Sequence, residues 1–211
     1  MNAILCRHAS IVIILLFNIS VAMAEVTASV TLTSNYVSNG ISQTDDGPAL
    51  QAGIDFEYKS GFYVGVWGSN VDPGYELDLN AGYFYKIEEN LGFDIGATRF
   101  TYTDNNFDED ATEVYIGCLC FVGLFFYAEG RYQGFDYINY DFRTEYEIQN
   151  DLTIGLHYGI VEYDGLDGDF YDYYLSLKKS YKKYDIALTH WYSEFTDDAK
   201  TFVSLSRKFE F

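Results

Sequence analysis

The chain has 211 residues, enough for one domain, and its 13 lysines and arginines against 32 aspartates and glutamates give a formal net charge of −19. Such a charge argues against nucleic acid and anionic polymers as ligands. Hydrophobic residues make up 48% of the chain and aromatic residues 19%, which excludes an intrinsically disordered protein. The 21 tyrosines, 17 phenylalanines and 18 glycines, with only two prolines, predict an all-β fold.

Residues 1–24 have the pattern of a secretory signal peptide. Arg7 and His8 precede an apolar run over residues 11–17, and Ala22 and Ala24 form a small-residue cleavage site. The run is shorter than the ~20 residues that a membrane-spanning helix needs. We therefore expect export and cleavage after Ala24, with residues 25–211 forming the folded domain.

Beyond the signal, hydrophobic and polar residues alternate with the period of two that is typical of an amphipathic strand. Residues 50–59, 75–85, 140–148 and 152–160 show the pattern most clearly. We predict twelve strands, at residues 25–37, 50–59, 62–71, 75–86, 91–102, 112–121, 125–134, 140–148, 152–163, 170–179, 184–192 and 199–211. Connections after the even-numbered strands are short, and most of those after odd-numbered strands are longer and acidic. This alternation is typical of an outer-membrane barrel whose termini lie on one side.

The distribution of aromatic residues and charges favours a membrane barrel over a soluble sandwich. Tyrosines such as Tyr75, Tyr85, Tyr140 and Tyr192 lie near strand ends, as in the aromatic girdles at the two bilayer interfaces. The polar phase carries acids and glycines but few of the lysines that protect exposed sheets. The sequence therefore predicts an antiparallel up-and-down transmembrane β-barrel surrounded by outer-membrane lipid, with polar side chains facing a wet lumen.

Some residues depart from this alternation. Basic residues on the lipid-facing phase all lie near strand ends, where they cost ~0–1 kcal/mol instead of ~2–4 at the midplane; they are Arg99, Lys179, His190 and Arg207. Phe100 and Tyr102 fall out of phase with the preceding residues of their strand. For that strand we expect a β-bulge or a strand end above the membrane.

One segment resembles a known family. Residues 34–43 (SNYVSNGISQ), 47–55 (GPALQAGID) and 60–71 (SGFYVGVWGSNV) are similar to the opening of the TorF porin family. The likeness is specific over residues 28–85, and beyond that it is mainly one of strand spacing. It implies an outer-membrane channel of undefined substrate, and it transfers no catalytic residue.

The last residues resemble the C-terminal signal that the barrel assembly machinery recognises. This signal has aromatic residues at the last and third-last positions, where the chain has Phe211 and Phe209. The resemblance implies the assembly machinery as a partner. The alternative is an ordinary edge strand that ends in phenylalanine.

A twelve-stranded barrel would have a backbone radius of about 12 Å, enough for ions and small solutes. The residues expected to line the lumen are mostly acidic: Asp55, Glu57, Glu76, Asp78, Asp94, Glu129, Arg131, Asp141, Arg143, Glu145 and Glu147. A negative lumen predicts a preference for cations or for neutral and zwitterionic solutes over anions. The alternative is that these acids pair with the arginines and only hydrate the wall.

Other functions have weaker support in the sequence. Residues 164–169 and 108–110 are acidic, but residues 164–169 lack the glutamate of an EF-hand at the proper distance. We therefore expect solvated loop acids that at most bridge divalent ions weakly at the cell surface, and neither a dedicated metal site nor a cofactor. His190 and Ser193 would point to opposite faces of a strand, which does not favour hydrolysis. Cys118 and Cys120 share the apolar face and are expected to pack against lipid. A non-conducting structural or adhesive barrel and, less favoured, a barrel hydrolase are the alternatives to a channel.

Overall fold

The computed structural model describes residues 24–103, 110–132, 135–165 and 168–211. They form fourteen strands, and none of the described residues belongs to a helix that could cross a membrane. The strands are β1 (Ala24–Thr33), β2 (Val37–Ser38), β3 (Ile41–Ser42), β4 (Ala49–Tyr58), β5 (Phe62–Asn70), β6 (Tyr75–Glu88), β7 (Leu91–Thr103), β8 (Ala111–Cys120), β9 (Gly123–Tyr132), β10 (Phe135–Gln149), β11 (Leu152–Tyr163), β12 (Asp169–Tyr181), β13 (Tyr184–Ser193) and β14 (Asp198–Glu210).

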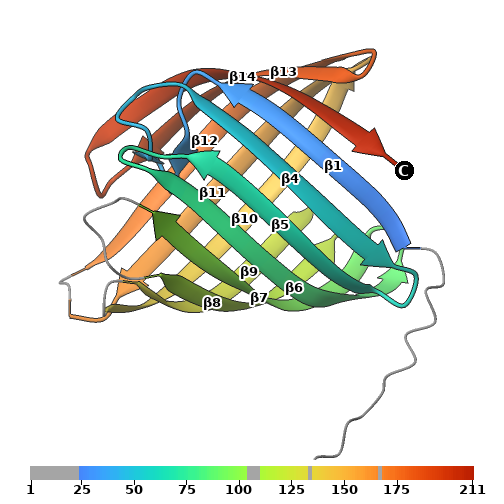
Figure 1. Ribbon diagram of the computed structural model, residues 1–211, viewed down its shortest axis with the longest axis horizontal. Helices are drawn as coiled ribbons and strands as arrows, with labels where there is room; N and C mark the ends of the chain where they lie inside the picture. The colour runs from blue at the N-terminus through green and yellow to red at the C-terminus, as the bar shows by residue number, and fades with distance from the viewer. Residues whose placement is uncertain (1–23, 104–109, 133–134, 166–167) are drawn as a thin grey trace, which may run out of the picture.

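Twelve of these strands form one closed antiparallel barrel, which confirms the predicted fold class and strand number. Each strand pairs with its neighbours in the chain, and β1 closes the barrel by pairing with both β14 and β4. Figure 1 shows the strongly tilted strands and the first and last barrel strands side by side. We call the end with Ala24 and Glu210 the terminal end and the opposite end the loop end. Closure leaves no barrel strand with an unpaired edge.

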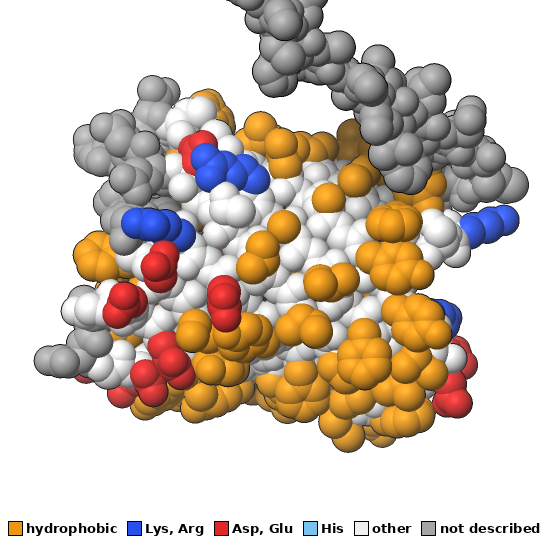
Figure 2. Space-filling view, turned by 90° about the horizontal axis from the view of Figure 1, so that it is seen from below, with side chains coloured by type: hydrophobic (Ala, Val, Ile, Leu, Met, Phe, Trp, Pro, Cys, Tyr) orange, Lys and Arg blue, Asp and Glu red, His pale blue; other side chains and the backbone are white. Residues whose placement is uncertain are grey.

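The distribution of polar and apolar side chains is the reverse of that in a soluble protein. Large hydrophobic residues on the outer face are exposed, among them Leu79 at 52% and Ile95 at 60%. Polar residues on the inner face are buried, including His157 and Asp172. Figure 2 shows hydrophobic side chains across one outer face, with most of the acidic side chains there gathered toward one end. This distribution suits a barrel whose outside faces lipid and whose inside is polar.

Two predicted boundaries were wrong. The first strand was expected to reach residue 37, but β1 ends at Thr33, whose hydroxyl donates to the Asn35 carbonyl at 2.7 Å and begins a turn. The seventh and eighth strands were expected to leave residues 135–139 as a loop. Instead β10 starts at Phe135, so β9 and β10 are separated only by residues 133–134, which lie outside the described part of the chain.

The segment between β1 and β4 contains a small hairpin that the strand pattern did not predict. Asn39 and Gly40 connect β2 to β3, and both have positive φ angles, 47° and 72°. Two successive residues of this kind are typical of a type I′ turn, for which Asn-Gly is the favoured sequence. We call residues 34–48, which contain this turn, the hairpin loop.

Of the two explanations expected for Phe100 and Tyr102, the β-bulge is absent, and both residues lie near the end of β7. The register of β6 and β7 is continuous from Tyr75 opposite Thr103 to Lys86 opposite Gly92, and it shifts only between Lys86 and Glu88. Phe100 and Tyr102 simply face the interior. The inner wall accepts aromatic rings, so an aromatic residue in the polar phase does not require a register shift.

Candidate functional site

Most of the residues expected to line the lumen lie on the inner face of the barrel. The strand register and the alternation of exposure place Asp55, Glu57, Glu76, Asp78, Asp94, Asp141, Arg143, Glu145 and Glu147 there. Glu76 and Asp141 are buried, at 4% and 6% exposure. The inner wall therefore has the polar, acidic character that its sequence suggests.

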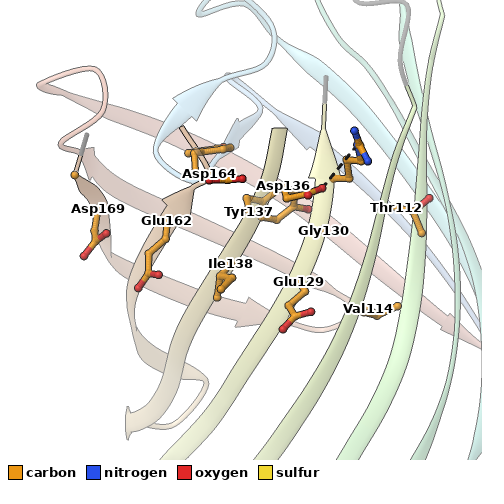
Figure 3. A pocket seen from close by; sticks show the side chains of 13 residues that line it. Thr112, Val114, Glu129, Gly130, Asp136, Tyr137, Ile138, Glu162, Asp164 and Asp169 are labelled. Atoms are coloured by element: carbon orange, nitrogen blue, oxygen red, sulfur yellow. Dashed lines mark ion pairs between the residues drawn. The ribbon is translucent and has the colours of Figure 1, made fainter. Parts of the chain in front are cut away.

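Glu129 and Arg131 do not belong to this set, and their expected position was wrong. Glu129 is paired across the sheet with Val114, which is 54% exposed on the outer face. Figure 3 shows Glu129, Ile138 and Glu162 at the loop end of neighbouring strands. Arg131 lies 3.7 Å from Asp136, and both side chains are about two-thirds exposed. The error arose because residues 124–127 are apolar on both faces of β9, so alternation did not define its phase.

Tyrosine rings lie against glycines along the inner wall. Tyr63, Gly82, Gly96 and Tyr115 are successive cross-strand partners on β5, β6, β7 and β8. A β-carbon on either glycine would overlap the neighbouring tyrosine ring. The two hydroxyls contact each other above the glycines, and that of Tyr63 also donates to Asp94 at 2.9 Å. The missing side chains thus give the two rings room to lie along the wall.

A third tyrosine ring lies against a glycine of the wall in the same way. Tyr137 on β10 covers Gly130 on β9, and its hydroxyl donates to Glu113 on β8 at 3.0 Å. Glu113 was not among the expected lumen residues. The sequence did contain a signal for it, because Glu113 alternates along β8 with the apolar, outward-facing Val114 and Ile116.

His157 lies in a cluster of charged side chains in the lumen, three of which are buried. Its Nε2 lies 2.7 Å from Asp172 Oδ1 and its Nδ1 3.2 Å from Asp141 Oδ2, while the side chain is only 1% exposed. Arg143 binds Asp141 through Nε at 2.8 Å, and Trp191 donates to Asp172 at 2.6 Å. The cluster joins β10, β11, β12 and β13, so it braces four neighbouring strands. Neither His157 nor Asp172 is among the residues predicted to line the lumen, because their contact depends on strand register.

Some acids of the wall and of the hairpin loop have lysine partners that the strand pattern does not predict. Lys178 on β12 lies 2.6 Å from Glu145, and Lys200 on β14 lies 2.8 Å from Asp46 and 3.0 Å from Asp198. Acids such as Glu76 and Asp94 instead accept hydrogen bonds from tyrosines. Ion pairing therefore neutralises part of the acidic wall, and hydrogen bonds from tyrosines stabilise some of the other acids.

The hairpin loop folds into the barrel at the loop end, as Figure 1 shows. Tyr36 packs edge-on against Trp67 of β5, with ring centroids 5.5 Å apart, and lies beside Glu76 of β6. Burial and the nearby Glu76 raise the pKa of Tyr36 above its usual range, so it remains a neutral hydroxyl. On the other side, a β-carbon on Gly40 would lie 3.1 Å from the Ser193 Cα of β13. The loop therefore reaches from β6 to β13 across the mouth of the barrel.

A cavity of about 330 Å³ lies beneath this loop. Inner-face residues of β1, β4, β5, β10, β12, β13 and β14 line it together with Asn35, Tyr36 and Val37 of the loop. Because β5 and β10 lie on opposite sides of the barrel, the cavity spans the lumen.

The other candidate sites do not come together. His190 lies on the outer face with its Nδ1 2.7 Å from Thr201 Oγ1, whereas Ser193 is 2% exposed on the inner face. Cys118 and Cys120 are free thiols. Among the described residues, no group of three or more His, Cys, Asp or Glu side chains is placed to hold a metal ion. Of the two acidic loops considered for calcium, residues 104–109 and 166–167 lie outside the described ranges.

One protein-family model matches residues 20–210 of the chain. The chain belongs to the Gcw_chp family. This family is described as a bacterial protein of unknown function. No curated protein matches the chain.

Several solved structures resemble the Gcw_chp barrel. The KdgM porin in complex with disordered oligogalacturonate has a TM-score of 0.61 at 11% identity, over 89% of this chain and 99% of that one. The outer-membrane protein Omp33 of Acinetobacter baumannii has a TM-score of 0.54 at 11% identity, over 89% and 99% of the two chains. The NanC porin has a TM-score of 0.53 at 9% identity, over 88% and 98%. At these identities the likeness shows the shared barrel fold.

Proposed function

We propose that the Gcw_chp barrel is an outer-membrane channel for passive diffusion of small solutes, with a preference for cations or for neutral and zwitterionic solutes over anions. The observation that carries this proposal is the closed barrel with an apolar outer face and an acidic inner face. Only closed barrels and helices satisfy their backbone groups in hydrocarbon. A polar interior inside such a barrel is typical of a water-filled path.

The charge of the wall supports the predicted selectivity. Glu113, Asp172 and Asp185 add to the acids on the inner face, while Arg143, Lys178, Lys200 and Lys208 are the main cations there. The acids outnumber these cations, so a negative potential remains. Rings of charged side chains select ions by sign, although screening over ~8 Å at physiological salt weakens the effect in a wide pore.

Sequence and fold comparisons also favour this function and location. The resemblance of residues 28–85 to the TorF porin family agrees with a channel in the outer membrane, and solved porins share the fold. In outer-membrane barrels the short turns lie on the periplasmic side and the longer loops outside the cell. The terminal end would therefore face the periplasm, and the hairpin loop would face the cell exterior. Phe209 and Phe211 would then be presented to the barrel assembly machinery, after removal of residues 1–24.

Single-channel recording tests the proposal. Protein refolded without residues 1–24 is inserted into a planar bilayer, and the reversal potential is measured under a KCl gradient. We expect discrete conductance steps and a reversal potential whose sign corresponds to cation preference. Absence of conductance would overturn the channel, and anion preference would overturn the acidic-lumen argument.

A second candidate function is a non-conducting structural or adhesive barrel. It is favoured by the position of the hairpin loop, which reaches across the mouth of the barrel. The loop is held by the Lys200–Asp46 ion pair at 2.8 Å and by a backbone hydrogen bond from Asp72 to Gln43 at 2.8 Å. Replacing residues 37–42 with a short glycine linker distinguishes the two functions. A channel that already conducts should conduct more after this change, whereas a barrel closed by the loop should conduct only after it. The Lys200→Gln variant, which loosens the loop without shortening it, serves as the intermediate case.

A further inference from the structure

The cavity beneath the hairpin loop has the size of a small-molecule site. Its volume of about 330 Å³ lies at the lower end of the ~300–1,000 Å³ that is usual for ligand pockets. It is lined by the inner face of strands from both sides of the barrel. A ligand there would be surrounded by the wall and covered by residues 35–37 of the loop.

Both tryptophans of the chain, Trp67 and Trp191, line this cavity. Trp67 is held by the edge-on contact with Tyr36, and Trp191 by its hydrogen bond to Asp172 and an edge-on contact with Tyr174 at 4.9 Å. Side chains fixed in this way lose little conformational freedom when a ligand binds. Their apolar faces suit a ligand with a flat C–H face.

The cavity also contains polar side chains that are free to bind a ligand. Gln51, Thr31, Thr189, Ser176 and Ser204 line it, and their side chains make no hydrogen bond within the described part of the chain. Hydroxyl and amide groups both donate and accept hydrogen bonds. A ligand rich in hydroxyl groups can satisfy such a mixture, since each of its hydroxyls also does both.

The charges of the lining favour an uncharged ligand. Among the described residues that line the cavity, only Glu145 and Lys178 are charged, and their side chains lie 2.6 Å apart. The pair neutralises itself, so neither a cation nor an anion finds an unpaired opposite charge in the lining. An anion would in addition meet the negative potential of the surrounding wall.

We propose that this cavity is a binding subsite for a neutral, polyhydroxylated ring, the chemistry of a mono- or disaccharide. The inference rests on the proposed channel, because it takes the lumen as the path of the solute. The aromatic side chains contact the apolar face of the ring, and Gln51 and the free hydroxyls bind its edge. A weak site of this kind increases occupancy of the lumen by the matching solute while still allowing it to leave.

Tryptophan fluorescence tests the subsite directly, since both tryptophans of the protein line it. The refolded barrel, without residues 1–24, is titrated in detergent with glucose, maltose and, as the charged counterpart, galacturonate. We expect a saturable change in emission with a neutral sugar and a weaker response to galacturonate. Trp67→Phe and Trp191→Phe variants, each with one remaining tryptophan, should both respond.

Substitutions separate binding at the cavity from a nonspecific effect. Gln51→Ala and Thr189→Val should each weaken sugar affinity about tenfold, the effect of ~1.4 kcal/mol. Ser206→Ala serves as the control, because Ser206 lies on the inner face but does not line the cavity. Unchanged affinity in both cavity variants, despite a folded barrel, would overturn the site.

Measuring conductance beside fluorescence shows whether the proposed binding site or the proposed channel function is wrong. No saturable emission change with sugars up to about 100 mM, well above the millimolar range of weak sites, would overturn the subsite even if the barrel conducts. An equal or stronger response to galacturonate would overturn the neutral ligand class. A saturable sugar response in a barrel that does not conduct would support the site and contradict only the channel.

Discussion

Tyr63 and Tyr115 lie three strands apart on the inner wall, yet their hydroxyls meet above Gly82 and Gly96. The four residues form one cross-strand row, so the two glycines determine whether the rings can lie along the wall. Phe126 has the same relationship to Gly117 on the adjoining strand. At these three positions, glycines of the polar phase leave room for aromatic rings to lie against the wall.

The Gly130 and Tyr137 pair tests this relationship. A β-carbon on Gly130 would lie 2.6 Å from Tyr137 Cε1, and its three nearest neighbours all belong to the Tyr137 side chain. We expect Gly130→Ala to lower the free energy of unfolding by about 1–3 kcal/mol, measured by urea unfolding in lipid vesicles. Combining it with Tyr137→Ala should cost less than the sum of the two single changes.

Gly53→Ala provides the matched control for that substitution. A β-carbon on Gly53 would meet Ser29 Oγ at 3.2 Å, Trp67 Cδ1 at 3.3 Å and the Val66 carbonyl oxygen at 3.4 Å, all farther away than the Tyr137 atoms that a β-carbon on Gly130 would meet. Its cost should stay below about 1 kcal/mol. Equal losses for Gly53→Ala and Gly130→Ala, or additive losses in the double variant, would contradict the role of the ring.

His157 and His190 allow a second prediction, since one is buried in the lumen and the other lies on the outer face. His157→Leu leaves the buried carboxylates of Asp141 and Asp172 without the group between them. Removing one partner of a buried ion pair costs about 3–5 kcal/mol, which urea unfolding should detect. His190→Leu, at an exposed position on the outer face, should change stability by less than about 1 kcal/mol. Similar effects of the two substitutions would contradict the bracing role of the cluster.

Strand phase was predictable wherever only one face of a strand is apolar. In β4, β6 and β11 the polar phase contains acids, glycine or histidine, and the inner and outer faces follow directly from the sequence. In β9 the run of residues 124–127 is apolar on both faces, and the charge of Glu129 then suggested the wrong side. The physical reason is that this inner wall is not uniformly polar, because rings such as Phe126 lie over its glycines.

The contacts within the site were less predictable than the strands. The His157–Asp172 and Glu113–Tyr137 contacts depend on the register between strands, and a slip of one residue would exchange the faces. A single sequence does not define that register. The hairpin loop did have a local signal, since Asn39-Gly40 favours a two-residue turn. Its docking against Ser193 and Trp67 is tertiary and has no sequence pattern.

Acidic residues on the inner face should influence ion selectivity, whereas those on the outer face should not. Asp55 and Glu57 lie on the inner face of β4, and neither forms an ion pair within 4 Å in the described structure. Combining Asp55→Asn with Glu57→Gln should move the reversal potential under a KCl gradient toward zero. The shift should be larger near 10 mM salt, where the screening length is about 30 Å, than near 1 M, where it is about 3 Å.

The control for selectivity uses the acids that lie outside the barrel. Glu129 and Glu162 sit on the outer face at the loop end, so Glu129→Gln with Glu162→Gln removes the same charge as the inner pair. The reversal potential should remain unchanged in this variant. An equal shift in both variants would show that the lumen acids do not determine selectivity.

The last residue tests the proposed assembly signal separately from stability. Phe211 is 80% exposed, and only its backbone is bound, through a hydrogen bond from its nitrogen to the Val26 carbonyl at 3.0 Å. Phe211→Ala should therefore change the unfolding free energy of the refolded protein by no more than about 0.5 kcal/mol. In cells, the amount of folded barrel in the outer membrane should fall severalfold, because the aromatic side chain would be recognised during assembly. Phe121, 73% exposed in a turn at the same end, provides the control, and Phe121→Ala should assemble normally. Equal assembly of the two variants, with equal stability, would mean that Phe211 only ends a strand.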